Sequence, residues 1–413
     1  MTKAFRPSES LKGVRYEIRG NLAHRAQELE RLGYEVISLN IGNPGLFGFR
    51  TPETMRLAMI ENLHSSEPYC HQKGVFPARE AVVMQQQDRG IQGVTVEEVF
   101  IGNGVSELID LSLRALLNPG DEVLIPSPDY PLWTAGVTLN QGKAVHYDCL
   151  PENGFLPDPA QLKKLINRRT RAIVIINPNN PTGAVYPREL LASIVELAEQ
   201  RELVVFSDEI YDQMVFDDAE FVPVAQLVKN TLCGSFSGLS KVYRACGYRV
   251  GWVTFSGALE HARDFLHGLE LLASLRLCSN VPGQWAVQTA LGGFQSIREL
   301  VRPGGRLYES RQVVIDSVAE SPYLSLVAPA GAMYAFIGVN KDRLPAFDDH
   351  QFAMDLLESK HVLVAPGTSF NVPYNNFFRI TILPDAGVLK DVFQRIDSVL
   401  AGYASDQMLE SVS

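Results

Sequence analysis

The sequence predicts an α/β fold, in which helices cover both faces of a mostly parallel sheet, together with a smaller α+β domain. Strand-like and helix-like segments alternate from about residue 97 to residue 210, as in parallel sheets with helical connections. Residues 172–176 are apolar at every position, which is typical of a strand covered on both faces. Polar and glycine-rich clusters follow the strands, where functional residues gather in such sheets.

The first 50 residues are predicted to contain one helix and one short strand. Residues 17–33 carry apolar residues at helical spacing and end in a glycine. Residues 36–39 then read as a strand that runs into the turn 42–45. We expect residues 1–50 to pack with the small domain.

The segment 51–302 is predicted to form the large domain. Its core strands are expected at 99–101, 123–125, 172–176 and 203–206. Helices are expected at 106–117 and 189–200.

The pattern changes after about residue 300, where Pro303, Gly304 and Gly305 interrupt the chain. A helix is expected over 307–319, followed by short strands around 332–336 and 378–380. Residues 303–413 are therefore predicted to form the smaller C-terminal domain.

Composition argues against several functions. The 413 residues include 37 Lys and Arg and 47 Asp and Glu, so the net charge is −10. An acidic chain without a long basic run is not expected to bind nucleic acid or an anionic membrane. The five cysteines are scattered without metal-ligand spacing, so no metal is expected. The N-terminus lacks a signal-like apolar run and no segment is long enough to span a bilayer, which predicts a cytoplasmic protein.

Residues 102–107, Gly-Asn-Gly-Val-Ser-Glu, lie between a predicted strand and a predicted helix. Backbone N–H groups at a helix start, with glycines that allow close approach, form a site for an anion such as phosphate. A purely structural turn is the alternative, and the segment does not match the common nucleotide-binding fingerprints.

The apolar strand 203–206 ends at Ser207, Asp208 and Glu209. A carboxylate in that position needs a cationic or hydrogen-bonding partner. Either it caps the start of a following helix, or it pairs with a protonated ring nitrogen of a ligand.

Lys241 follows a run of small residues and precedes Arg249 by eight positions. A lone lysine is usually a solvated surface charge. An amine that forms a Schiff base and a fixed guanidinium that binds phosphate are together the parts of a cofactor site.

These segments resemble the class I/II aminotransferases of fold type I, and the resemblance extends over essentially the whole chain. It rests on residues 180–183 (Asn-Pro-Thr-Gly), 207–211 (Ser-Asp-Glu-Ile-Tyr), 240–241 (Ser-Lys), Arg249 and 378–380 (Phe-Arg-Ile). Residues 16–20 and 39–44 resemble the bacterial glutamate–pyruvate, or alanine, type.

The resemblance implies the cofactor pyridoxal 5'-phosphate. Lys241 would hold it as a Schiff base and then act as the acid and base. Asp208 would pair with the pyridinium nitrogen and keep the ring an electron sink. Asn180 and Tyr211 would bind the ring oxygen, and Tyr130 would stack on the ring.

The same resemblance assigns the phosphate contacts. Val105, Ser106 and Arg249 would hold the phosphate group. Tyr69 would reach the phosphate site of a neighbouring subunit, which implies a homodimer. Ser240 would also contact the cofactor.

Substrate contacts are implied as well. Arg379, with Gly42 and Asn180, would bind the α-carboxylate, for which a guanidinium is well suited. Tyr16 and Arg19 would bind the distal carboxylate of glutamate.

Two positions depart from the family pattern. Gly238 stands where a serine is common, so the phosphate hydroxyl comes from Ser237 or from Ser240. Arg244 stands where the commonest signature has a small or apolar residue.

The preferred hypothesis is transfer of an amino group between a small L-amino acid, L-alanine with pyruvate, and the pair 2-oxoglutarate and L-glutamate. An aminotransferase for an unusual biosynthetic amino acid remains an alternative. So does a pyridoxal-phosphate lyase, decarboxylase or racemase, because such enzymes share the Lys, Asp and Arg. A non-catalytic regulator is disfavoured, since no DNA-binding module is appended.

Overall fold

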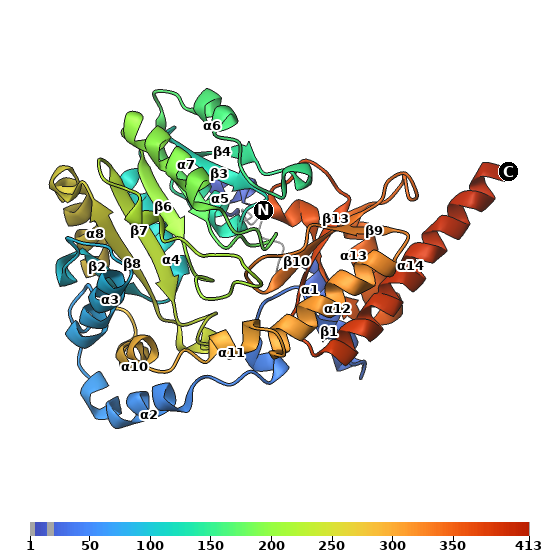
Figure 1. The fold of residues 1–413 in the computed structure, drawn as a ribbon, viewed down its shortest axis with the longest axis horizontal. Coiled ribbons are helices and arrows are strands. Elements are labelled where there is room, and N and C mark those ends of the chain that lie inside the picture. The colour runs from blue at the N-terminus through green and yellow to red at the C-terminus, as the bar shows by residue number, and fades with distance from the viewer. Residues whose placement is uncertain (1–4, 15–19, 413) are drawn as a thin grey trace.

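The computed structural model describes residues 5–14 and 20–412, and Figure 1 shows that they form two sheets with their helices, side by side. The larger sheet and its helices come from the middle of the chain. The smaller sheet comes from the C-terminal part and lies beside the N-terminal helix α1. The fold-class prediction of an α/β protein with a second α+β part is confirmed.

The larger sheet has the strand order β2-β8-β7-β6-β5-β3-β4 among the described residues. Its strands are β2 (Val99–Gly102), β3 (Glu122–Ser127), β4 (Lys143–Asp148), β5 (Thr170–Ile176), β6 (Val204–Asp208), β7 (Leu232–Gly238) and β8 (Gly251–Gly257). All neighbouring pairs are parallel except those of β8, which runs antiparallel to β2 and β7. The predicted strands are present, whereas β4, β7 and β8 were not predicted.

Alternate residues of β5 belong to two different cores, which explains why this strand is apolar throughout. Ile173 and Ile175 pack in one cluster, with residues of α7 (Arg188–Gln200). Val174 packs in the other, with residues of α4 (Val105–Leu116) and α8 (Arg263–Leu275). Successive side chains of a strand point to opposite faces, so both faces of the sheet are covered.

Further helices come from the chain between residues 53 and 301. They are α2 (Glu53–Glu61), α3 (Phe76–Asp88), α5 (Pro131–Leu139), α6 (Pro159–Leu165), α9 (Val281–Gln284), α10 (Ala286–Gly292) and α11 (Ile297–Val301).

The smaller sheet has the order β12-β13-β10-β9. It consists of β9 (Leu324–Leu326), β10 (Tyr334–Val339), β12 (Ala365–Pro366) and β13 (Phe377–Thr381). Its helices are α12 (Arg306–Glu320), α13 (Asp349–Lys360) and α14 (Ala386–Val412), the last of which projects away from the body (Figure 1).

The N-terminal segment contacts this smaller part. Strand β1 (Ile37–Ser38) pairs in parallel with β11 (Val362–Leu363), and α1 (Asn21–Arg31) contacts α13. The boundaries placed at residues 50 and 302 stay a prediction. Among the described helices, none has the length and apolar character needed to cross a membrane.

Candidate active site

A cavity of about 720 Å³ lies at the carboxyl ends of β5 and β6. Many of the site residues predicted from the sequence line this cavity. These are Gly42, Val105, Ser106, Tyr130, Asn180, Asp208, Tyr211, Ser240, Lys241, Arg249 and Arg379. They come from the N-terminal segment, the large sheet and the smaller sheet, so the fold has to form before the cavity exists.

Lys241 follows β7 and reaches across to the N-terminal segment. Its Nζ donates a hydrogen bond of 2.7 Å to the carbonyl oxygen of Gly42. The side chain is partly exposed to the cavity. The amine is therefore held at one point and remains accessible to a ligand.

The two departures from the family pattern have structural reasons. A side chain at Gly238 would meet the carbonyl oxygen of Val250 at 2.8 Å, so the close contact of β7 with β8 requires glycine. The Arg244 guanidinium is buried and links the segment after Lys241 to two other parts of the chain. It donates hydrogen bonds to the carbonyl oxygen of Arg50 at 3.0 Å and to Ser296 Oγ at 2.7 Å. Arg244 thus has a structural role here.

Asp208 is the last residue of β6 and is 3% exposed. The indole Nε1 of Trp133 donates to its Oδ2 at 3.1 Å. Burial raises the pKa of Asp208 to about 6, although the Trp133 bond and the charge of Lys241 act in the opposite direction. No described helix begins directly after Asp208, so the helix-capping alternative is wrong. A buried carboxylate beside a cavity fits a cationic ligand atom.

The start of α4 forms the opposite, electropositive part of the cavity. Its N-cap is Gly104, at φ 82°, and no side chain caps the helix. A Cβ at Gly104 would overlap the Arg249 guanidinium, so the glycine lets the cation lie against the helix start. Helix N-termini with an adjacent guanidinium bind phosphate well.

The positions of Ser237 and Ser240 indicate which of them can contact a phosphate in the cavity. Ser240 lines the cavity, whereas Ser237 lies buried within β7 and is not among the lining residues. Of the two, Ser240 is therefore the one placed to contact an anion there.

Arg379 lies on β13 at the other side of the cavity. Its guanidinium is held between the rings of Tyr334 and Phe370, with centroid distances of 4.1 Å and 4.6 Å. Nη1 donates to Asn180 Oδ1 at 2.8 Å, and Nη2 donates to the carbonyl of Asn40. A guanidinium fixed in this way suits a carboxylate.

The structure does not place three predicted site residues in this cavity, one because it lies elsewhere and two because they are outside the described residues. Tyr69 is 77% exposed and is not among the lining residues. Tyr16 and Arg19 lie outside the described residues.

Sequence reasoning missed several residues of the site. Tyr334 and Cys246 line the cavity, as do Ile41, Asn43, Ile176, Ile210 and Gly247. Tyr334 opens a strand that reads as ordinary core, and the Trp133 contact with Asp208 joins segments 75 residues apart. Neither the position of Tyr334 in the site nor the Trp133 contact can be recognised from the neighbouring residues in the sequence.

Comparison with known proteins identifies the family. The family model described as "Aminotransferase class I and II" matches residues 34–396. Glutamate-pyruvate aminotransferase AlaA of Escherichia coli is 48% identical over 396 residues, which are 96% of this chain and 98% of that protein. An alanine aminotransferase of Mycobacterium tuberculosis is 46% identical over 97% of this chain and 94% of that protein.

Solved structures agree with this result. The crystal structure of an aminotransferase from Escherichia coli superposes with a TM-score of 0.95 at 47% identity, and covers 97% of this chain and 100% of that chain. The resemblance found in the sequence is therefore confirmed over nearly the whole length. The chain belongs to the class I and II aminotransferase family.

Proposed function

We propose that the protein is a pyridoxal-5'-phosphate-dependent aminotransferase that moves the amino group between L-alanine and 2-oxoglutarate, giving pyruvate and L-glutamate. The observation that carries the proposal is one cavity with the Lys241 amine, the buried Asp208 carboxylate and the anion-binding start of α4. The relatives named above as glutamate-pyruvate and alanine aminotransferases support the substrate assignment.

The lining residues fit this cofactor. Lys241, Arg249 and Arg379 supply three cations, while Asp208 supplies a carboxylate away from bulk water. A phosphate, a substrate carboxylate and a protonated ring nitrogen need this combination of charges. Val105, Ser106 and Arg249 would hold the phosphate, with Ser240 beside them. Asn180 and Tyr211 would bind the ring oxygen, and Tyr130 would lie against the ring.

When bound, the cofactor supplies a ring that withdraws electrons from the α-carbon of the substrate. Lys241 Nζ would take the proton from that carbon and deliver it to the cofactor carbon bonded to the same amino nitrogen, which is a 1,3-proton shift. Asp208 holds its negative charge against the ring nitrogen. Arg379 orients the α-carboxylate by a bidentate contact, with Gly42 and Asn180 beside it.

A half-reaction screen tests the proposed substrates. Purified enzyme is mixed with each amino acid in the absence of an oxo acid, and the cofactor absorbance is followed. L-Alanine and L-glutamate are expected to bleach the band fastest, and pyruvate or 2-oxoglutarate to restore it. A faster response to another amino acid would favour the unusual-substrate alternative. Loss of ammonia or CO₂ without recovery by an oxo acid would favour a lyase or decarboxylase.

The distal carboxylate provides a separate test of the substrate pair. We propose that Arg19, helped by Tyr16, binds the second carboxylate of glutamate, which alanine lacks. Arg19→Ala is then expected to slow the glutamate half-reaction more than the alanine half-reaction, by roughly one to three powers of ten, because a charge-assisted pair is lost. Arg379→Ala should slow both equally. Equal slowing of both by Arg19→Ala would contradict the role.

We also propose a homodimer, supported by exposed apolar side chains on two neighbouring segments, one from Tyr69 to the start of α3 and one at the end of α8. The exposed residues are Tyr69, Phe76, Leu271, Leu275 and Leu277. The segment after Tyr69 contacts α8 through two polar interactions. Gln72 donates a hydrogen bond to the Glu270 carboxylate at 2.7 Å, and Lys73 forms an ion pair with the same carboxylate at 3.2 Å. Exposed apolar side chains gathered on neighbouring segments are typical of interaction surfaces.

A charge placed on this surface tests the dimer. Leu275→Glu is expected to convert the protein to a monomer with weakened cofactor binding, because the carboxylate would have to be desolvated. Light scattering and cofactor titration measure the two effects. Leu32→Glu, at a site 70% exposed beside α1, serves as the matched control and should stay dimeric. A parent protein that is a fully active monomer would refute the proposal.

A further inference from the structure

Tyr334 lies at the meeting point of the parts that form the cavity. It is the first residue of β10, pairs with Thr381 of β13, and shares its sheet face with Arg379 two positions away on that strand. Its ring centroid lies 4.1 Å from Arg379 Cζ. The ring is therefore one wall of the Arg379 site.

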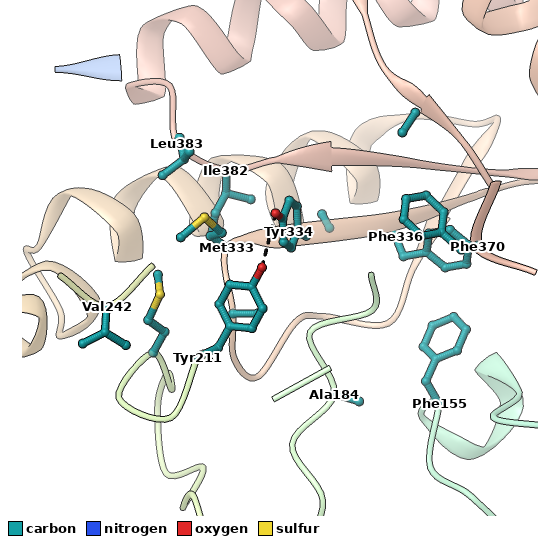
Figure 2. Packing of buried hydrophobic residues seen from close by; sticks show 14 of the residues in the cluster. Phe155, Ala184, Tyr211, Val242, Met333, Tyr334, Phe336, Phe370, Ile382 and Leu383 are labelled. Atoms are coloured by element: carbon teal, nitrogen blue, oxygen red, sulfur yellow. Dashed lines mark hydrogen bonds between the residues drawn. The ribbon is translucent and has the colours of Figure 1, made fainter. Parts of the chain in front are cut away.

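The hydroxyl of Tyr334 lies beside Tyr211 and Gly42. The Tyr211 hydroxyl donates to it at 3.3 Å, and Figure 2 shows the two groups facing each other from the loop after β6 and from β10. A Cβ at Gly42 would overlap the same hydroxyl. Gly42 in turn accepts the hydrogen bond of Lys241 Nζ at 2.7 Å. Tyr334 thus contacts Arg379, Tyr211 and Gly42 at once.

The charges around Tyr334 favour a strong hydrogen bond. Burial raises the pKa of the Tyr334 phenol, but the charges of Lys241 and Arg379 together with the hydrogen bond from Tyr211 outweigh it, so the pKa is lowered despite the opposing effect of Cys246. Burial raises the pKa of Tyr211, and the neighbouring Tyr334 raises it further. A phenol with a lowered pKa is the stronger hydrogen-bond donor, so the Tyr334 O–H is suited to donate to the Tyr211 oxygen once Tyr211 donates elsewhere.

We propose that Tyr334 is a positioning residue with two separable functions: its hydroxyl orients the Tyr211 phenol toward the cofactor ring oxygen, and its ring face fixes the Arg379 guanidinium for the substrate carboxylate. This inference rests on the proposed function. When Tyr211 donates to the ring oxygen, the Tyr334 O–H donates to the Tyr211 oxygen and strengthens that bond.

Two substitutions separate the functions. Tyr334→Phe removes the hydroxyl and keeps the ring, whereas Tyr334→Leu removes both. One readout is the pH midpoint at which the visible absorbance of the bound cofactor changes. The other is the dissociation constant of propionate, a carboxylate that lacks an amino group and cannot react.

Tyr334→Phe is expected to raise the absorbance midpoint by about half a pH unit, because one hydrogen bond that favours the ring oxygen anion is lost. The midpoint should move in the same direction as it does in the Tyr211→Phe variant. Propionate affinity should stay within about twofold of that of the parent protein. Tyr334→Leu is expected to show the same shift and also to weaken propionate binding about tenfold, because the cation–π contact is lost.

Tyr147→Phe is the matched control. Tyr147 is a fully buried tyrosine of β4 whose hydroxyl donates to the carbonyl of Val174 at 2.7 Å, and it does not line the cavity. An unchanged midpoint in Tyr334→Phe, or an equal shift in Tyr147→Phe, would overturn the role of the hydroxyl. Unchanged propionate affinity in Tyr334→Leu would overturn the role of the ring. A parent protein that binds pyridoxal phosphate without any visible band that titrates would instead refute the proposed function, and this role with it.

Discussion

Replacing Lys241 by alanine is expected to abolish amino-group transfer while leaving the fold intact. The Schiff-base amine and the proton carrier are lost together, so the rate should fall by roughly five or six powers of ten. The fold should survive because the side chain makes one described hydrogen bond, to Gly42, worth about 1 kcal/mol.

Single-turnover kinetics with L-alanine measure the rate, and circular dichroism with thermal unfolding measures the fold. Lys163→Ala, at an exposed lysine of α6, is the matched control and should keep parental activity. Transfer by Lys241→Ala within tenfold of the parent would show that another group performs the chemistry.

Asp208→Asn is expected to lower the transfer rate by several powers of ten while cofactor is still bound. An amide lacks the negative charge that stabilises a protonated ring nitrogen, so the electron sink weakens. The Asn side chain can still accept the hydrogen bond of Trp133, so the local packing should persist. Near-parental turnover in this variant would reject the role of Asp208.

The same substitution is expected to stabilise the cofactor-free protein. Burial raises the pKa of Asp208 from 3.8 to about 6, so the folded state binds a proton more tightly than the unfolded state. Protonation of Asp208 therefore stabilises the folded state fully below about pH 4, and this contribution is lost as the pH rises through 6. At pH 8, ionised Asp208 costs the parent about 3 kcal/mol, which the Asn variant avoids.

Denaturant unfolding of both cofactor-free proteins at several pH values measures this difference. The advantage of Asp208→Asn should be largest above pH 7 and shrink toward zero as the pH falls from 6 to 4. An advantage that is independent of pH, or that grows at low pH, would contradict the burial argument.

The fold could be predicted where the sequence pattern has a local cause. The apolar run of β5 indicates that both of its faces are covered. Gly104 lies two residues after β2, and Asp208 is the last residue of β6. Strand β7 was not predicted because it contains glycine and serine at most positions. Its pairing with β6 and β8 overrides that low propensity.

The site could be predicted where family motifs are contiguous, as around Lys241 and Arg379. Tyr334 could not, because its position depends on the register of β10 with β13 and on a contact with Tyr211 over 123 residues of chain. The identity of the hydrogen-bonding partner of Asp208 could not be predicted either, since Trp133 lies 75 residues away in the chain. Such long-range contacts leave no local pattern.

Reduction with borohydride followed by peptide mapping is the most direct test of the central claim that Lys241 holds the cofactor. The purified protein is loaded with pyridoxal phosphate, reduced and digested, and the labelled peptide is sequenced. The account predicts one label per chain, on the peptide that contains Lys241, and none in Lys241→Ala. A label on another lysine, or no label in protein that turns over L-alanine, would contradict it.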